Sequence, residues 1–232
     1  MGFIFNQDHI NSTMADMNYD AAKLPLGKLS KTTILRGYQV LKDLSALFDD
    51  QSLASSEYNK TYLEAVEQLS NQFYSYIPHA FGRNRPPVIA SIKHLETEVK
   101  LLESLTDLKD ADSIIKTDKG GSKINIIDSR YKGLGMREIT PVHHETKEYL
   151  NVQEYLEKTR GQSHGLSYQV MDVFRIEREG ESDRFKNLTG TKSDRKLLWH
   201  GSRSTNFAGI LSQGLRIAPP EAPGMAPFPT PY

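Results

Sequence analysis

Apolar residues recur at three- and four-residue steps along most of the first half of the chain, and this spacing constrains the fold more than any other feature. Ser30 and Ser91 each precede such a stripe as an N-cap, because a Ser side chain accepts hydrogen bonds from the first backbone N–H groups of a helix. The three stripes consist of Ile34, Tyr38, Leu41, Leu44 and Phe48, then Tyr62, Val66, Leu69 and Phe73, then Ile92, Leu95, Val99 and Leu102 with Leu108, Ala111 and Ile115 beyond. Helices with one apolar face must bury that face against each other, so the sequence predicts a helical bundle.

The second half of the chain changes from helical spacing to alternation. Residues 169–177 alternate and are rich in β-branched and aromatic side chains, which predicts a strand. The short apolar run at 196–200 also predicts a strand, whereas 145–158 and 205–211 keep helical spacing. Gly214 closes the second of these helices as its C′ residue. The predicted fold class is therefore α+β, an N-terminal all-α helical bundle followed by a mixed α/β region.

A polar segment with paired glycines, residues 117–122, predicts a linker between the two regions. The charge balance also changes there, because residues 1–118 carry 12 basic and 16 acidic side chains and residues 119–232 carry 17 and 13. The last fourteen residues hold six of the eleven prolines, which is typical of a disordered tail. We therefore predict domains over 1–118 and 119–223 and a disordered Pro-rich tail over 224–232.

The composition excludes several classes of function. The 232 residues include no Cys, which removes disulfides, cysteine zinc sites, iron–sulfur clusters and thiol nucleophiles. Lys+Arg and Asp+Glu both number 29, whereas a free-standing nucleic-acid binder is usually basic. We expect no membrane partner, because no secretory signal and no run of about 18 apolar residues is visible. We also expect no metal, since His143 and His144 lack a second His one helical turn later.

The motif His200-Gly201-Ser202 is the first with binding chemistry. Gly201 has no Cβ, so its backbone can approach a planar amide closely. The ring of His200 can bond a ribose hydroxyl, and the hydroxyl of Ser202 can add another bond. Each net hydrogen bond contributes about 1 kcal/mol, so specific binding needs several together. On this motif alone, a structural His with satisfied hydrogen bonds remains an alternative interpretation.

The longer string around this motif resembles a known signature. Residues 197–223, which begin Leu-Leu-Trp-His-Gly-Ser-Arg and end Pro-Pro-Glu-Ala-Pro, closely resemble the NAD-binding signature of DNA-dependent poly(ADP-ribose) polymerases. Residues 173–181 resemble the strand and turn that precede it in that family. Residues 23–31 and 73–79 resemble parts of the family's regulatory helical domain. The resemblance follows the family order from about residue 4 to residue 223.

The resemblance implies a role for several residues of the second half. His200 matches the first member of the family's His–Tyr–Glu triad, which bonds a ribose hydroxyl of NAD+. Gly201 matches the residue whose backbone holds the nicotinamide amide. Ser202, Asn206 and Arg216 match positions that line the adenosine side of the pocket. NAD+ would therefore be the substrate, with no metal required.

The resemblance also implies a regulatory role for the helix that carries Glu103 and Asp107. In the family this helix packs over the NAD+ site and blocks it until DNA breaks are sensed. The two acids lie one helical turn apart, opposite part of the apolar stripe. A solvated helix face remains the other interpretation of these two residues.

The sequence departs from the family pattern after residue 223. From Gly224 onward it no longer resembles the family, so the triad Tyr and Glu are not matched, and Tyr232 stands in an unrelated context. The family's zinc fingers and its Trp-Gly-Arg-rich domain are not matched either. We therefore expect a C-terminally truncated member with an incomplete ADP-ribosyltransferase domain, as a fragment, a gene-model artefact or a natural short form.

The expected function is transfer of ADP-ribose from NAD+ to protein side chains and to growing ADP-ribose chains, in DNA-damage signalling. We expect this chain to be inactive alone. The expected partners are NAD+ and acceptor proteins, including the chain itself. DNA breaks would act only through domains outside this sequence, and the expected location is the nucleus. The alternative is a non-catalytic regulatory or interaction protein built on the helical bundle.

Overall fold

The computed structural model describes residues 2, 4–117, 125–160, 168–189, 196–216 and 223. The chain divides into two compact units, Met1–Leu134 with His200–Ala226 and Gly135–Trp199 with Pro227–Tyr232. Most of the predicted linker, residues 118–122, and the predicted tail, residues 224–232, lie outside the described residues. The predicted domain boundary after residue 118 therefore stays a prediction.

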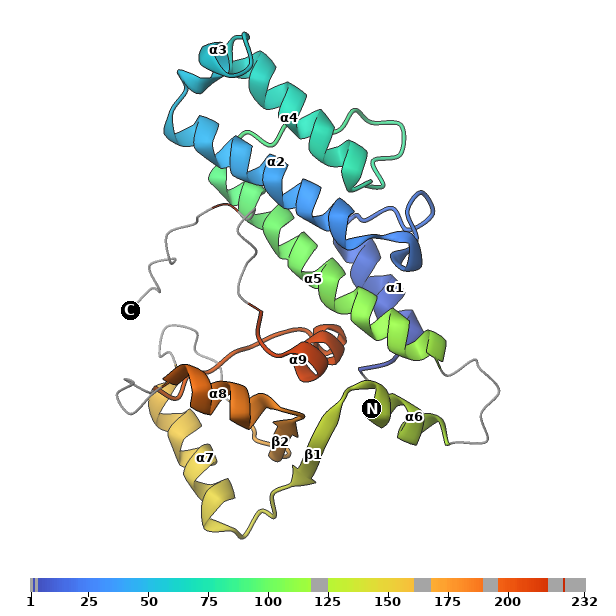
Figure 1. The fold of residues 1–232 in the computed structure, drawn as a ribbon, viewed down its shortest axis with the longest axis vertical. Coiled ribbons are helices and arrows are strands. Elements are labelled where there is room, and N and C mark those ends of the chain that lie inside the picture. Colours follow the sequence, from blue (N-terminus) through green and yellow to red (C-terminus); the bar gives the residue numbers. More distant parts are fainter. Residues whose placement is uncertain are drawn as a thin grey trace. The chain divides into compact units, whose positions relative to one another are not determined.

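The described part of the first unit consists of helices (Figure 1). In chain order they are α1 (Gln7–Asp16), η1 (Leu26–Lys28), α2 (Lys31–Asp49), α3 (Leu53–Ser56), α4 (Tyr62–Tyr76), α5 (Ile92–Thr117), α6 (Ile126–Gly133), η3 (Ser204–Asn206) and α9 (Phe207–Gln213). Helices α2, α4 and α5 lie side by side, with α2 in contact with both of the others (Figure 1). The predicted helical bundle is confirmed.

Local sequence explains where these helices begin. The side chain of Ser30 accepts a hydrogen bond from the backbone N–H of Thr33 and caps α2. Thr61 and Glu64 form a capping box at the start of α4, which satisfies two otherwise free N–H groups. The hydroxyl of Ser91 accepts from the N–H of His94 at the start of α5. The two predicted Ser caps are thus confirmed.

Helix α5 buries apolar side chains on more than the single face that the sequence predicts. It is one continuous helix of 26 residues, and Leu101, Leu102, Leu105 and Leu108 are all buried. These leucines occupy more than one side of the helix, because α5 packs against α2 and also against α9. The helix is therefore the centre of the first unit, with covering elements from both ends of the sequence.

The second unit combines helices with a two-stranded sheet. Its elements are β1 (Met136–Pro141), α7 (Lys147–Thr159), β2 (Phe174–Arg178) and α8 (Glu181–Thr189). The two strands pair antiparallel, with Ile139 opposite Ile176 and a register irregularity between Met136 and Glu138. Helix α7 confirms the helix predicted over 145–158. Together the two units confirm the α+β fold class.

Two strand predictions need correction. The strand predicted over 169–177 begins only at Phe174. The strand predicted over 196–200 is wrong, because these residues pair with no strand among the described ones. Leu197 and Leu198 are 68% and 80% exposed, so among the residues that the structure describes the apolar run has neither a ladder partner nor a covering layer. By contrast, α9 and Gly214, which has φ 83°, confirm the predicted short helix and its end.

No helix in the described part of the chain is long and apolar enough to cross a bilayer.

Candidate functional site

A groove of about 1390 Å³ runs along α5 within the first unit. It is lined by residues of α1, α2, α4 and α5, by the segments that follow α1 and α4, and by the segment from 200 to 216. All seven site residues predicted from the sequence line it, namely Glu103, Asp107, His200, Gly201, Ser202, Asn206 and Arg216. The fold therefore brings together residues that lie about a hundred positions apart in the sequence.

The close approach of α9 to α5 depends on a glycine. A Cβ atom on Gly209 would lie 2.8 Å from the backbone Cα of Asp107 and would also overlap its carboxylate. No real side chain tolerates that separation, so only Gly allows the two helices to pack at this distance. This contact sets the segment around Asn206 and Arg216 against the acidic side of α5.

The motif at 200–202 is open to solvent. His200, Gly201 and Ser202 are all exposed. A Cβ placed on Gly201 would meet no atom within 4 Å, so the space beside its backbone is free. A planar amide could therefore reach the peptide groups of Gly201, as the sequence predicts.

Asn206 is the buried polar residue of the site. Its Nδ2 donates to the hydroxyl of Ser202 at 3.2 Å and to that of Ser104 on α5 at 3.5 Å. Its Oδ1 is buried and has no hydrogen-bond partner in the described part of the chain. Buried polar atoms normally have a partner, so this oxygen is a natural acceptor for a donor group of a ligand.

Arg216 is held by the carboxylates of α5. It forms an ion pair with Asp110, and its Nη1 lies 3.9 Å from Oδ1 of Asp107. The guanidinium of Arg216, which the sequence predicts to face the adenosine side of the site, is therefore paired with carboxylates of α5 in this structure. An anionic ligand would have to compete with the carboxylates for it.

Burial changes the acidity of the groups along this side of α5. It raises the pKa of Asp107 from 3.8 to about 6, with Arg216 opposing the rise and Asp110 and Glu103 adding to it. Burial also raises the pKa of Glu103, while the charges of Lys100 and His200 oppose that rise. The carboxylate of Asp107 therefore lies in a partly desolvated setting that resists further negative charge.

The solvated-face interpretation of the two acids fits only one of them. Glu103 is exposed, whereas the side chain of Asp107 is only 18% exposed. Burial also raises the pKa of Tyr38 on α2, with the charges of Glu103 and Asp107 adding to the rise. The two acids therefore face groups of the groove as well as water.

Two contacts of the groove were missed by sequence reasoning. Ser104 bonds Asn206, and Asp110 pairs with Arg216. The three-residue spacing from Asp107 to Asp110 places both acids on one helix face, which could have indicated a shared partner. No comparable sequence signal pointed to Ser104. In the described residues, no group of three or more His, Asp or Glu side chains could hold a metal ion.

Comparison with known proteins gives two family matches, one after the other along the sequence. Residues 1–131 match the family described as "Poly(ADP-ribose) polymerase, regulatory domain", and residues 146–226 match "Poly(ADP-ribose) polymerase catalytic domain". The chain is 38% identical to poly [ADP-ribose] polymerase 1 of Gallus gallus over 221 residues, which is 95% of this chain and 21% of that protein. It is 38% identical to poly [ADP-ribose] polymerase 2 of Zea mays over 226 residues, 96% of this chain and 33% of that protein. It is 40% identical to poly [ADP-ribose] polymerase 2-B of Oryza sativa subsp. japonica over 213 residues, 90% of this chain and 33% of that protein.

The two family matches place the chain in the class of ADP-ribosyltransferases that combine a regulatory and a catalytic domain. The chain belongs to the poly(ADP-ribose) polymerase family. It spans between 21% and 33% of the length of these curated relatives.

Proposed function

We propose that this chain forms the regulatory helical domain and the first part of the NAD+-binding site of a poly(ADP-ribose) polymerase. The substrate is NAD+, and the reaction transfers ADP-ribose to protein side chains, including those of the enzyme itself, and to growing ADP-ribose chains, with no metal in the mechanism. One observation carries this proposal: the seven residues predicted from the sequence line a single groove along α5.

Each of the site residues has a proposed role in holding NAD+. His200 bonds a ribose hydroxyl, and the open backbone of Gly201 holds the nicotinamide amide. Ser202, Asn206 and Arg216 bind the adenosine side. Asn206 is supported in this role by its buried, unpartnered Oδ1. Removing the side chain of Asn206 would leave the ligand donor that it pairs with unsatisfied, which costs about 1–3 kcal/mol of binding free energy.

Helix α5 is proposed to regulate this site. Glu103 and Asp107 line the groove. Asp107 and Asp110 both pair with the guanidinium of Arg216. The diphosphate of NAD+ carries negative charge, so these carboxylates oppose its binding as long as α5 keeps this position. Domains outside this sequence would release the helix when they sense DNA breaks, which places the function in DNA-damage signalling in the nucleus.

We further propose that the 232-residue chain does not transfer ADP-ribose by itself. The triad Tyr and Glu of the family are not matched in this sequence. The Glu would stabilise the positive charge that develops on the ribose as the bond to nicotinamide breaks. Loss of one such preorganised group typically lowers the rate by about 10²–10³-fold.

Two measurements on the purified chain test these proposals. Saturation-transfer NMR should detect NAD+ binding that His200→Ala weakens, and the matched variant His9→Ala, outside the groove, should leave binding unchanged. Incorporation of labelled ADP-ribose should not exceed that of a boiled sample. Incorporation that His200→Ala abolishes would contradict the proposed inactivity. Absence of NAD+ binding both in the unchanged chain and in a variant with Asp107→Asn and Asp110→Asn, in which the carboxylates no longer hold Arg216, would instead favour the alternative, a non-catalytic regulatory or interaction protein built on the bundle.

A further inference from the structure

The sheet of the second unit ends in two outer edges. The residues that the structure describes add no third strand to β1 and β2. A pair of strands alone is marginally stable in water, and an outer edge carries unpaired backbone N–H and C=O groups. No residue of these two strands lines the groove along α5, so the inference below does not depend on the proposed function.

The outer edge of β1 is interrupted, whereas that of β2 is regular. The register between the strands is irregular between Met136 and Glu138, so one residue of β1 has no opposite partner. β1 also ends at Pro141, which has no N–H to donate. Bulges and prolines at an edge oppose pairing with another chain. β2 runs from Phe174 to Arg178 with neither feature, so its edge is the one suited to a partner.

A hydrogen bond beside the two strands shows which groups of β2 face outward. The N–H of Val142, directly after β1, donates to the carbonyl of Val173, directly before β2, at 2.8 Å. The backbone groups of Val173 therefore point toward β1, and along an antiparallel strand this direction alternates with each residue. The N–H and C=O groups of Phe174 and Ile176 consequently point away from β1.

Two apolar side chains on one face of β2 are exposed. Phe174 is 55% exposed and Ile176 is 42% exposed. Side chains two residues apart lie on the same face of a strand, and Ile139 of β1 stands opposite Ile176. β2 thus offers an apolar face together with outward backbone groups, the two features through which one strand adds to another.

The charges of β2 determine what kind of strand fits this edge. The strand reads Phe-Arg-Ile-Glu-Arg. When a second β2 lies antiparallel with Ile176 opposite Ile176, Arg175 of each copy stands opposite Glu177 of the other. Sliding the register by two residues places Arg175 opposite Arg175 or Glu177 opposite Glu177, and like charges directly opposite are destabilising. Sliding it by one residue places outward groups opposite inward ones, so the backbone cannot pair.

We propose that a second copy of this chain binds the outer edge of β2 with Ile176 opposite Ile176. The two copies then form one antiparallel sheet of four strands, in the order β1, β2, β2, β1. The arrangement has two-fold symmetry, because both copies use the same surface. Ile139 and Ile176 of both copies form one apolar row across the sheet, which gives it the shared hydrophobic face that a stable sheet needs.

The charged side chains of β2 have partners within one copy that compete only weakly with a second copy. Arg175 pairs with Glu148 on α7, and Oε1 of Glu177 lies 3.2 Å from Nη1 of Arg137. Ion pairs that are open to solvent contribute little to stability. On β1, Glu138 stands opposite Glu177, so Arg175 of a second copy also offsets this contact between like charges.

Sedimentation velocity of the full chain over a range of concentrations tests for the dimer. The unchanged protein should dimerise as its concentration rises. Arg175→Glu and Glu177→Arg each replace two attractive cross-strand pairs by two repulsive ones, so each should weaken dimerisation by about tenfold or more. Arg83→Glu, a charge reversal at an exposed residue of the loop after α4, is the matched control and should leave dimerisation unchanged. A chain that stays monomeric at every concentration would refute the proposal.

An equimolar mixture of Arg175→Glu and Glu177→Arg separates loss of pairing from loss of folding. In a mixed dimer the two reversed charges face each other and the two original charges face each other, so both pairs again join opposite charges. The mixture should therefore dimerise as the unchanged protein does, whereas mixing cannot rescue a misfolded chain. Dimerisation that neither variant weakens would show that the copies meet at another surface, and the proposal would be wrong.

Hydrogen exchange of single amides, followed by NMR, tests the edge itself. Dimerisation should slow the exchange of the N–H groups of Phe174 and Ile176, which point outward. It should change little at Arg175 and Glu177, whose N–H groups point toward β1. Outward amides that are already protected in the monomer would mean that another part of the same chain covers this edge, and that result would overturn the proposal.

Discussion

The contact between Gly209 and Asp107 shows how much one residue decides in the groove. Asp107 is only partly exposed because the backbone of α9 lies directly against it. The same contact brings Arg216 near enough to pair with Asp107 and Asp110. Packing, burial and charge at this point thus all depend on the missing Cβ of one glycine.

Gly209→Ala should destabilise the first unit by about 1–3 kcal/mol, the usual cost of forcing extra atoms into a packed interface. The added Cβ would lie 2.8 Å from the Cα of Asp107, and backbone cannot move aside cheaply. Gly201→Ala is the matched control, since its Cβ meets no atom within 4 Å, and it should change stability by less than about 0.5 kcal/mol. Urea unfolding measures both, and equal effects would contradict the packing argument.

Asp107→Asn should change the pH dependence of stability in a defined direction. Burial raises the folded pKa of Asp107 from 3.8 to about 6. Between these values the folded chain keeps a proton that the unfolded chain has released, so this contribution to stability is lost as the pH rises through about 6. Asn cannot ionise, so the variant should gain stability relative to the unchanged protein between pH 4 and 7. A stability difference that stays constant over this range would argue against a buried, destabilising Asp107 charge.

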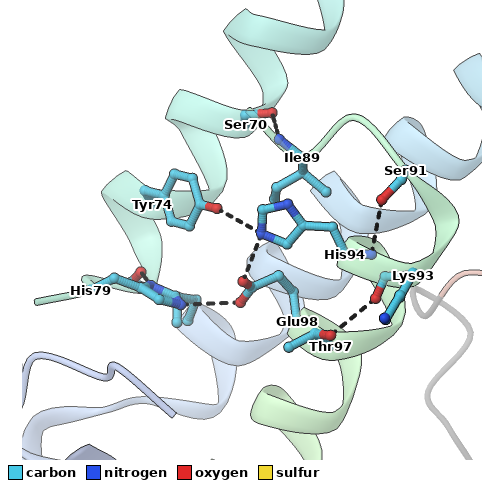
Figure 2. A network of polar contacts seen from close by, with 10 residues as sticks. Ser70, Tyr74, His79, Ile89, Ser91, Lys93, His94, Thr97 and Glu98 are labelled. Atoms are coloured by element: carbon cyan, nitrogen blue, oxygen red, sulfur yellow. Dashed lines mark hydrogen bonds and ion pairs between the residues drawn. The ribbon is translucent and has the colours of Figure 1, made fainter. Parts of the chain in front are cut away.

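At the scale of elements, the loop between α4 and α5 is fastened by α4 itself. The hydroxyl of Ser70 donates to the carbonyl of Val66 at 2.7 Å. It also accepts from the N–H of Ile89 at 2.9 Å (Figure 2). Ser70 is 1% exposed and Ile89 is fully buried. One hydroxyl therefore satisfies a loop N–H group that water cannot reach.

Ser70→Ala should cost about 1–3 kcal/mol, because the N–H of Ile89 would be buried without a partner. Ser75→Ala on the same helix is the matched control. Its exposed hydroxyl donates to the carbonyl of Gln72, an acceptor that water can replace, so its loss should change stability by less than about 0.5 kcal/mol. Thermal unfolding of the two variants compares them, and a near-neutral Ser70→Ala would show that the loop N–H finds another partner.

At the scale of the whole molecule, features that depend on neighbouring residues could be predicted from the sequence, whereas contacts between residues far apart in the sequence could not. The cap at Ser30 and the helical stripes depend on neighbouring residues, and the structure reproduces them. The strand predicted at 196–200 failed because a strand exists only beside a partner. The pairing of Arg216 with Asp110 joins residues 106 positions apart, and periodicity carries no information about such a contact. The groove was predicted through resemblance, because residue spacing alone left His200 open to a structural interpretation.

The last prediction concerns how far the helical unit depends on the segment from 200 to 216. This segment packs on α5 through η3 and α9, and Thr205 and Ala208 are almost fully buried there. The core between α2, α4 and α5 lies elsewhere, since Leu41, Phe73 and Leu102 are fully buried. A fragment of residues 1–134 should therefore still fold, but at reduced stability.

Circular dichroism of that fragment should show a cooperative helical melt at a lower midpoint than that of the full chain. Burial of one large apolar side chain contributes about 1.5–3 kcal/mol, and a domain is stable by only about 5–15 kcal/mol. Loss of the α9 cover is thus large enough to measure and small enough for the α2–α4–α5 core to survive. A non-cooperative melt would mean that the bundle requires α9, and an unchanged midpoint would mean that α9 adds no stability to it.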